Sequence, residues 1–188
     1  LTMGMRGMIQ NAVHLHDVRV GPEDVLGGIG QGMRIAQDIM EFGRVCIAAS
    51  GVGLMMRSGQ LMTRYASRRN IATGRLLDNF VSRERLTQIT VETEALDALI
   101  AAFATWLDSG VEVPKECYAA VKVLGAESSF RAVDRLVQIL GGRGYIETNL
   151  APQMLRDARL LRVFEGPTET MQTFVGMRVA AGSAELAT

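Results

Sequence analysis

The strongest constraint on the fold is the spacing of apolar residues between positions 86 and 107. They recur in alternating steps of three and four, with Thr93 the one member off type: Leu86, Ile89, Leu96, Ile100, Phe103 and Leu107. Acidic residues such as Glu92 and Glu94 fall on the other faces. This pattern puts the apolar side chains on one stripe of a helix and is typical of a helix in a bundle seam.

Further helices are expected on both sides of this seam. A helical period runs from Gly30 to about residue 67, and Pro114 opens a helix that continues to Gly141. Shorter helices are expected over residues 152–163 and 167–181. The sequence therefore predicts a mainly α fold, an up-and-down four-helix-type bundle.

Residues 1–29 differ from the rest of the chain. Val13 and Leu15, then Val18 and Val20, alternate with polar residues, and the alternation slips by one position at 16–17. This pattern predicts strands. An isolated ribbon is not stable alone, so we expect residues 1–29 to be the last strands of a truncated β-domain and residues 30–188 to be a C-terminal helical bundle domain.

Composition excludes several classes of function. The chain has 20 basic and 20 acidic residues, hence no net charge to attract nucleic acid or anionic lipid. The longest uncharged run in a helical stretch, residues 45–56, is shorter than the roughly 20 residues of a membrane span. Because residues 45–54 are apolar or small on every face, we expect them inside the bundle, with Cys46 and Cys117 as buried free thiols. No partnership with nucleic acid or membrane is expected.

Two motifs have plain structural explanations. His14 and His16 share a strand face, but no cluster of Cys, Asp or Glu completes a ligand set, so we expect no metal site. Glycines at 141, 142 and 144 follow a helix, whereas a dinucleotide fingerprint follows a strand. A helix C-cap explains them.

The segment around Glu165 has two interpretations. This carboxylate follows Phe164 and precedes Gly166 and Pro167, a corner that should open a helix. A carboxylate beside an aromatic ring can act as a general base. The alternative is a carboxylate that caps the helix N-terminus.

From end to end, the chain resembles the C-terminal half of the acyl-CoA dehydrogenase family, flavoproteins that oxidise acyl thioesters. The resemblance lies in motifs that occur in family order: residues 16–20 with 25–27 and 30–32, residues 65–69 with Gly74, residues 120–122, residues 138–145, and residues 156–159 with 164–166. The block at 138–145, Gln-Ile-Leu-Gly-Gly-Arg-Gly-Tyr, is the most specific of them.

The resemblance implies FAD bound between a β-domain and the bundle, and partly held by a neighbouring subunit. Arg69 matches the arginine that reaches an adjacent flavin's phosphates. Gln138, Gly141 and Gly142 match the block that lines the adenosine end across a dimer. Thr168 and Glu169 fall where the helix after the corner meets the cofactor.

The resemblance also implies the chemistry. Glu165 matches the catalytic base that removes an α-proton while the β-hydrogen leaves as hydride to the flavin, and Arg44, Phe164 and Gly166 are expected to bind substrate. Some members place the base just before the arginine that matches Arg44, but Gly43 there has no side chain to act. The Glu165 N–H is expected to bind the thioester carbonyl.

The resemblance leaves alternatives. A relative that uses oxygen, such as an acyl-CoA oxidase or flavin monooxygenase, fits the same motifs, and a helical oligomerisation domain without activity needs no cofactor. Expected partners are an acyl-CoA or acyl-carrier-protein thioester, electron-transfer flavoprotein or a similar acceptor, and copies of the chain in a homodimer or homotetramer. The expected location is the cytoplasm, or the mitochondrial matrix in a eukaryote.

Overall fold

The computed structural model describes residues 1–186, with side-chain surroundings up to residue 182, so the last two residues of the expected bundle domain lie outside it. Its elements in chain order are a 3-10 helix at Pro22–Asp24, α1 (Gly32–Ala66), β1 (Asn70–Ile71), β2 (Gly74–Arg75), a second 3-10 helix at Leu76–Asp78, α2 (Phe80–Asp108), α3 (Lys115–Leu140), α4 (Gly142–Tyr145), α5 (Leu150–Leu161) and α6 (Thr168–Leu186).

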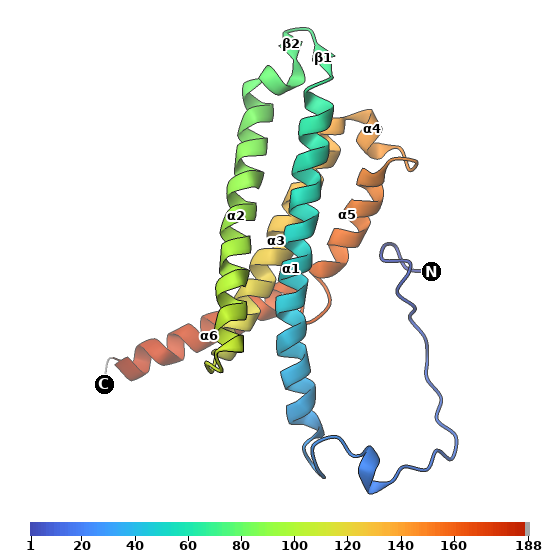
Figure 1. Cartoon of the computed structure of the whole chain (residues 1–188), viewed down its shortest axis with the longest axis vertical. Coiled ribbons are helices and arrows are strands. Elements are labelled where there is room, and N and C mark those ends of the chain that lie inside the picture. Colours follow the sequence, from blue (N-terminus) through green and yellow to red (C-terminus); the bar gives the residue numbers. More distant parts are fainter. Residues whose placement is uncertain (187–188) are drawn as a thin grey trace.

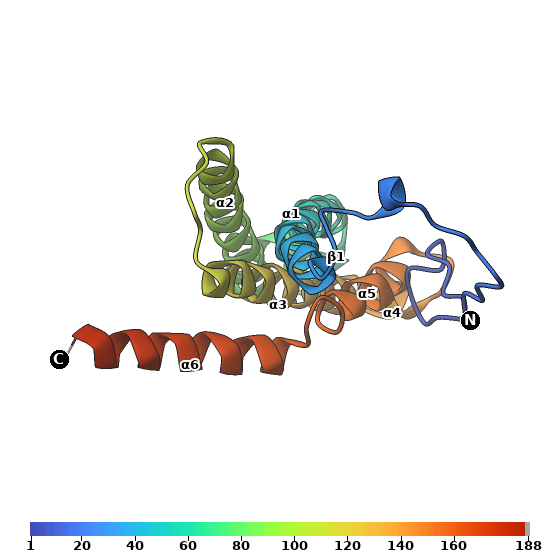
Figure 2. The ribbon, with the colours of Figure 1, turned by 90° about the horizontal axis from the view of Figure 1, so that it is seen from below.

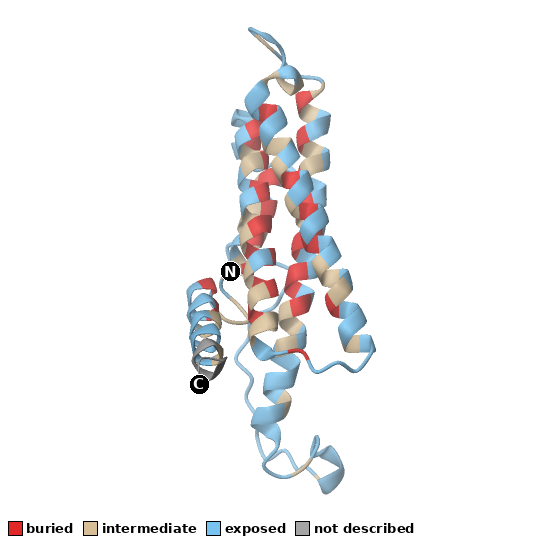
Figure 3. Ribbon diagram, turned by 90° about the vertical axis from the view of Figure 1, so that its left-hand side faces the viewer, coloured by how far each residue is buried: buried red, intermediate tan, exposed pale blue. Residues whose placement is uncertain are grey.

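The long helices run up and down side by side, as the sequence predicted (Figure 1). α1, α2 and α3 form the body of the bundle, and α5 packs on α3 as the fourth helix. Buried residues gather where these helices face one another (Figure 3). α6 leaves this arrangement and runs outward along α3 (Figure 2). The mainly α, four-helix-type bundle is thereby confirmed.

The turn between α1 and α2 follows from local chemistry. β1 and β2 pair antiparallel, with Asn70 opposite Arg75 and Ile71 opposite Gly74, whose φ of +117° is costly for other residues. The Asn79 side chain then caps α2 by accepting hydrogen bonds from the Val81 and Ser82 N–H groups at 3.0 and 3.4 Å. The hairpin therefore sets α2 antiparallel to α1.

The predicted seam of α2 faces the core. Ile89, Leu96 and Phe103 are buried, and the Phe103 ring meets Tyr118 of α3 edge-on at 4.9 Å between centroids. Thr93, the residue off type, is also buried, and its hydroxyl donates to the Ile89 carbonyl at 2.6 Å. This back-bond satisfies the hydroxyl, so a polar residue can occupy the seam.

Small residues bring α1 and α3 into close contact. A Cβ added to Gly51 would lie 2.8 Å from the Gly125 carbonyl oxygen, and one added to Gly125 would lie 2.5 Å from the Ala48 Cα. Backbones this close leave no room for a methyl group. The crossing of these two helices therefore depends on glycine at both positions.

We expect alanine to have opposite effects at two glycines of α1. Gly51→Ala overpacks the crossing and should lower the free energy of unfolding by about 1–3 kcal/mol. Gly53→Ala meets no atom within 4 Å, so it should raise stability by about 0.5–1 kcal/mol through helix propensity. Urea unfolding of both variants beside wild type measures the difference, and equal effects at the two sites would contradict the close crossing.

The face of α1 opposite the core does not match the sequence expectation. Cys46, Ala49, Ser50 and Gly53 are exposed, whereas residues 45–54 were expected inside the bundle, and Cys117 is only half-buried. Both thiols are free. The expectation was wrong because no described element covers this side of α1, although the residues are small and apolar.

The apolar character of α1 raises the question of whether this helix spans a membrane. α1 is long and apolar enough to cross a membrane by length and composition, with a mean hydropathy of 1.4 over its most apolar window. The core helix of a bundle meets the same criteria, and buried residues such as Met55 and Met62 place α1 in the bundle core. The absence of a membrane partner stays a prediction.

Residues 1–29 contain no strand, which corrects the predicted strands at 13–20. The physical reason is that a ladder needs a second strand, and the described residues supply no partner for this segment. Its beginning lies against α5, where the Met5 N–H donates to the Asp157 carboxylate. The assignment of residues 1–29 to a β-domain stays a prediction.

Candidate functional site

The corner between α5 and α6 has an unusual backbone. Glu165 has φ +53° and Gly166 has φ +95°, so two successive residues occupy left-handed conformations. A Cβ on Gly166 would lie 2.6 Å from the Met171 Cε, which adds a packing reason for glycine there. A non-glycine residue at positive φ is uncommon and often marks a functional site. At Glu165 the strain falls on the predicted catalytic residue.

The Glu165 carboxylate points into the bundle against α1. Its Oε2 atom is buried and has no hydrogen-bond partner. A Cβ added to Gly43 would lie 3.3 Å from the Glu165 Cδ and 3.4 Å from its Oε1. Within the described residues no N–H or hydroxyl donates to either carboxylate oxygen, so the helix-cap interpretation fails.

Arg44 follows Gly43, and its side chain bonds the backbone of the same corner. Its Nε donates to the Glu165 carbonyl oxygen at 3.3 Å. The residues predicted to bind substrate, Arg44, Phe164 and Gly166, thus lie together with Glu165. Arg44 and Glu165 are 121 positions apart in sequence. The part of the chain that the structure describes offers no acceptor for the Glu165 N–H, which leaves that donor available to a ligand.

Lys122 is a site residue to which sequence reasoning gave no role. It lies on α3, is fully buried, and its Nζ donates to the Gly166 carbonyl oxygen at 2.6 Å. Burial, followed by repulsion from Arg44, lowers its pKa, against the attraction of Glu127, Glu165 and Glu169. A lysine on the inner face of a predicted helix was the signal that could have found it.

The Thr168 side chain points into the protein and not towards solvent. It is buried, and its hydroxyl donates to the Glu127 Oε1 at 2.9 Å beside the Arg162 Nε at 2.7 Å. Burial alone would raise the pKa of the Glu127 carboxyl, but the bonds from Arg162 and Thr168 outweigh it and lower that pKa from its ordinary 4.5. The network stabilises the corner at neutral pH, and this stabilisation is lost as the pH falls through the lowered pKa.

Glu169 lies beyond this network on the surface. It borders a groove of about 650 Å³ between α1 and α6, together with Arg44, Lys115 and Phe174. Glu41 pairs with Lys115 there at 3.2 Å. The groove adjoins the corner, since Arg44 both lines it and bonds the Glu165 carbonyl.

A second group of predicted residues meets at the other end of the bundle. Arg69 shares a hollow of about 500 Å³ with Gly141, Gly142 and Arg143. No atom lies within 4 Å of a Cβ added to either glycine, so the backbone is open to a ligand. Gln138 is exposed on the last turn of α3. The structure thus joins the 65–69 motif to the 138–145 block.

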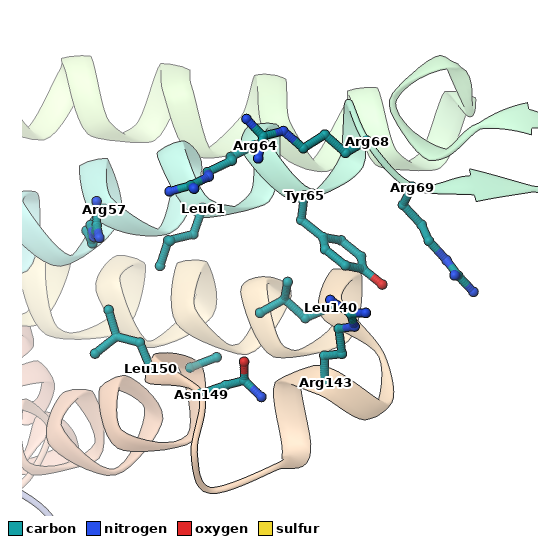
Figure 4. Close-up of a pocket in the computed structure, with 11 residues that line it drawn as sticks. Arg57, Leu61, Arg64, Tyr65, Arg68, Arg69, Leu140, Arg143, Asn149 and Leu150 are labelled. Carbon is teal, nitrogen blue, oxygen red and sulfur yellow. The ribbon is translucent and has the colours of Figure 1, made fainter.

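A basic groove of about 610 Å³ extends this second group along α1. Figure 4 shows Tyr65 pointing from α1 towards Leu140 and Arg143. The arginines that border the groove are Arg57, Arg64, Arg68, Arg69 and Arg143. Guanidinium groups suit phosphate oxygens. Of these arginines, the sequence assigned a cofactor-binding role only to Arg69, although the spacing of positions 57, 64 and 68 predicts one helix face.

The two groups lie far apart along α1. The helix between Gly43 and Ala66 spans about 35 Å at about 1.5 Å rise per residue. Glu165 lies beside Gly43 at one end of this stretch, and Arg69 follows Ala66 at the other.

The two histidines lie in the N-terminal segment, before α1. His14 and His16 are exposed, with ring centroids 6.4 Å apart. Among the described residues no three His, Cys, Asp or Glu side chains gather as metal ligands would.

The described geometry has counterparts among known proteins. The family model "Acyl-CoA dehydrogenase, C-terminal domain" matches residues 30–180. The mitochondrial very long-chain specific acyl-CoA dehydrogenase of Rattus norvegicus is 28% identical over 177 residues, which are 94% of this chain and 27% of that protein.

Solved structures agree with this match. Butyryl-CoA dehydrogenase from Megasphaera elsdenii superposes with a TM-score of 0.81 at 26% identity, covering 87% of this chain and 43% of that one. An acyl-CoA dehydrogenase complexed with FAD from Bacillus anthracis gives 0.81 at 25% identity, covering 91% and 32%. This chain spans less than half the length of each of these proteins.

Proposed function

The chain belongs to the acyl-CoA dehydrogenase family as its C-terminal helical domain, and we propose that it serves the FAD-dependent α,β-dehydrogenation of an acyl thioester. The observation that carries this proposal is the Glu165 carboxylate, which has a buried oxygen without a partner and faces Gly43. A carboxylate held this way is free to accept a proton. Glu165 is therefore the base, and the acyl group is carried by CoA or a carrier protein.

The residues present fit FAD. The hollow at Arg69 offers open glycine backbone, and the adjoining arginines suit a diphosphate. Gln138, Gly141 and Gly142 would lie along the adenosine end, and Glu169 near the corner would meet the cofactor of its own site. Thr168 supports that contact indirectly, since its hydroxyl is bonded to Glu127.

Each residue at the corner has a role in the proposed reaction. Glu165 removes the proton from the carbon next to the thioester carbonyl. Its own N–H donates to the carbonyl oxygen and stabilises the negative charge that develops there. Arg44 holds the Glu165 carbonyl, and Phe164 and Gly166 shape the substrate side. FAD, when bound, supplies the acceptor for the β-hydrogen, which leaves as hydride.

An anaerobic flavin spectrum tests this function. Addition of acyl-CoA to the purified flavoprotein should bleach the visible absorption of its flavin. If the protein binds no flavin, the result would favour the alternative of an inactive oligomerisation domain. Rapid return of the flavin absorption in air would favour the alternative of an oxidase. Electron-transfer flavoprotein, or a similar acceptor, is the proposed partner in the cytoplasm or mitochondrial matrix.

The separation of the two groups of residues supports a homodimer or homotetramer. About 35 Å of helix lies between Gly43, beside Glu165, and Ala66, near Arg69. Arg69 would therefore hold the phosphates of a neighbouring subunit's cofactor rather than those of the cofactor at Glu165. The exposed apolar face of α1 around Cys46 and Gly53 would lose water contact in such an assembly.

We expect Arg69→Ala to lower the FAD content and weaken the oligomer, because it removes a guanidinium group from the phosphate site. A charge-assisted hydrogen bond is worth roughly 1.5–3 kcal/mol, which corresponds to a loss of about ten- to a hundredfold in FAD affinity. The flavin-to-protein absorbance ratio and light scattering measure the two effects. The matched control is Arg83→Ala, because Arg83 is an exposed arginine of α2. An unchanged flavin-to-protein ratio in the Arg69 variant would contradict the role of Arg69.

A further inference from the structure

The Glu165–Gly166 turn is held by cations from two helices. The Arg44 Nε of α1 donates to the Glu165 carbonyl at 3.3 Å, and the Lys122 Nζ of α3 donates to the Gly166 carbonyl at 2.6 Å. These are successive carbonyl groups in a backbone with two left-handed residues. Such a conformation persists only where its surroundings impose it.

Lys122 is the more enclosed of the two cations. It has no exposed surface, whereas Arg44 is half-buried. An ammonium group away from water is costly unless it is bonded and paired. Its Nζ donates to the Gly166 carbonyl, and the carboxylates that attract it are Glu127, Glu165 and Glu169. The charge of Lys122 is therefore directed at the corner.

The choice of lysine is itself unusual in this chain. The sequence has two lysines, Lys115 and Lys122, and its other eighteen basic residues are arginines. A guanidinium group presents a fixed fork of five N–H donors, while an ammonium group is compact. A fully buried place that offers one carbonyl suits the ammonium. Lysine at position 122 matches the shape of its site.

We infer that Lys122 is a positioning residue of the proposed dehydrogenation: its buried ammonium group fixes the Gly166 carbonyl and thereby aims the Glu165 carboxylate and N–H at the substrate. This inference rests on the proposed function. Lys122 does not touch the reacting atoms; it acts through the turn. A small displacement of a catalytic group can cost about a hundredfold in rate.

Two variants at position 122 and one control test the inference in the holoenzyme. Lys122→Met keeps the length and apolar stem but removes the donor. Lys122→Gln is neutral and keeps an N–H donor. Ser129→Ala removes a fully buried hydroxyl from the same helix, where it donates to the Ala126 carbonyl. Glu165→Gln in the same assay reports on the proposed function itself.

The first measurement is the rate of flavin reduction by acyl-CoA under anaerobic conditions. Lys122→Met should reduce it about a hundredfold with FAD content and substrate affinity retained. Lys122→Gln should recover roughly tenfold of that loss through its remaining hydrogen bond, and Ser129→Ala should match wild type. If Lys122 only filled space, methionine would be at least as good as glutamine.

The second measurement is hydrogen exchange of the peptide that contains residues 164–168. Its amides should exchange faster in Lys122→Met, less so in Lys122→Gln, and as in wild type in Ser129→Ala. If Lys122→Met yields no folded holoenzyme, the comparison of Lys122→Gln with wild type decides: unchanged rate and exchange overturn the inference.

The remaining outcomes distinguish a failure of the Lys122 role from a failure of the proposed dehydrogenation. A wild-type reduction rate in Lys122→Met, with Glu165→Gln inactive, overturns the role of Lys122 and leaves the proposed function standing. A slow rate without faster exchange also overturns it, because Lys122 would then not act through the turn. Full activity of Glu165→Gln would remove the proposed function instead.

Discussion

We expect Glu165→Gln to keep its flavin and to reduce it at least about 10²–10⁴ times more slowly with acyl-CoA, the range ascribed to general-base catalysis. The amide has nearly the shape of the carboxylate but cannot take up the α-proton. The left-handed turn and its bonds from Arg44 and Lys122 involve backbone carbonyls and remain available. Stopped-flow absorbance under nitrogen measures the rate.

The matched control for this variant is Glu94→Gln. Glu94 is an exposed carboxylate on α2, outside both groups of site residues. It should reduce its flavin at the wild-type rate. The assignment of the base to Glu165 fails if Glu165→Gln reduces flavin within tenfold of wild type.

Local patterns were sufficient to predict the helices. The seam from Leu86 to Leu107 and the break at Pro114 depend on residues close in sequence, and the structure places α2 and α3 there. The same reasoning misjudged residues 45–54, because periodicity tells which faces are apolar and not which neighbours are present to cover them. It also misjudged residues 13–20, since strand pairing depends on a partner outside the segment.

The candidate site depended on information that spacing does not contain. Gly43 lies on α1, Lys122 on α3 and Glu165 in the corner between α5 and α6, and only the packing of these elements brings them together. The family resemblance supplied Glu165 and drew attention to Gly43, but it assigned nothing to Lys122. A buried lysine is recognised only when its burial and its acceptor are known.

The contact between Gly43 and Glu165 leads to a second prediction with a large effect. We expect Glu165→Gly to be as inactive as Glu165→Gln, and we expect the double variant Glu165→Gly with Gly43→Glu to regain about tenfold or more of the lost rate. Glycine accepts the positive φ at 165 without strain. A glutamate side chain on Gly43 starts 3.3 Å from the present Glu165 Cδ, so its carboxylate can occupy the same space.

The decisive comparison is with a double variant of equal bulk, Glu165→Gly with Gly43→Gln. It fills the same space with a neutral amide and should regain nothing, because recovery requires a group that accepts a proton. Gly43→Glu alone should be slower than wild type, since it forces a second carboxylate against the first. Anaerobic reduction rates of all four proteins measure the effect. Equal rates in the Glu and Gln double variants would show that the space beside Gly43 is not where the proton is taken.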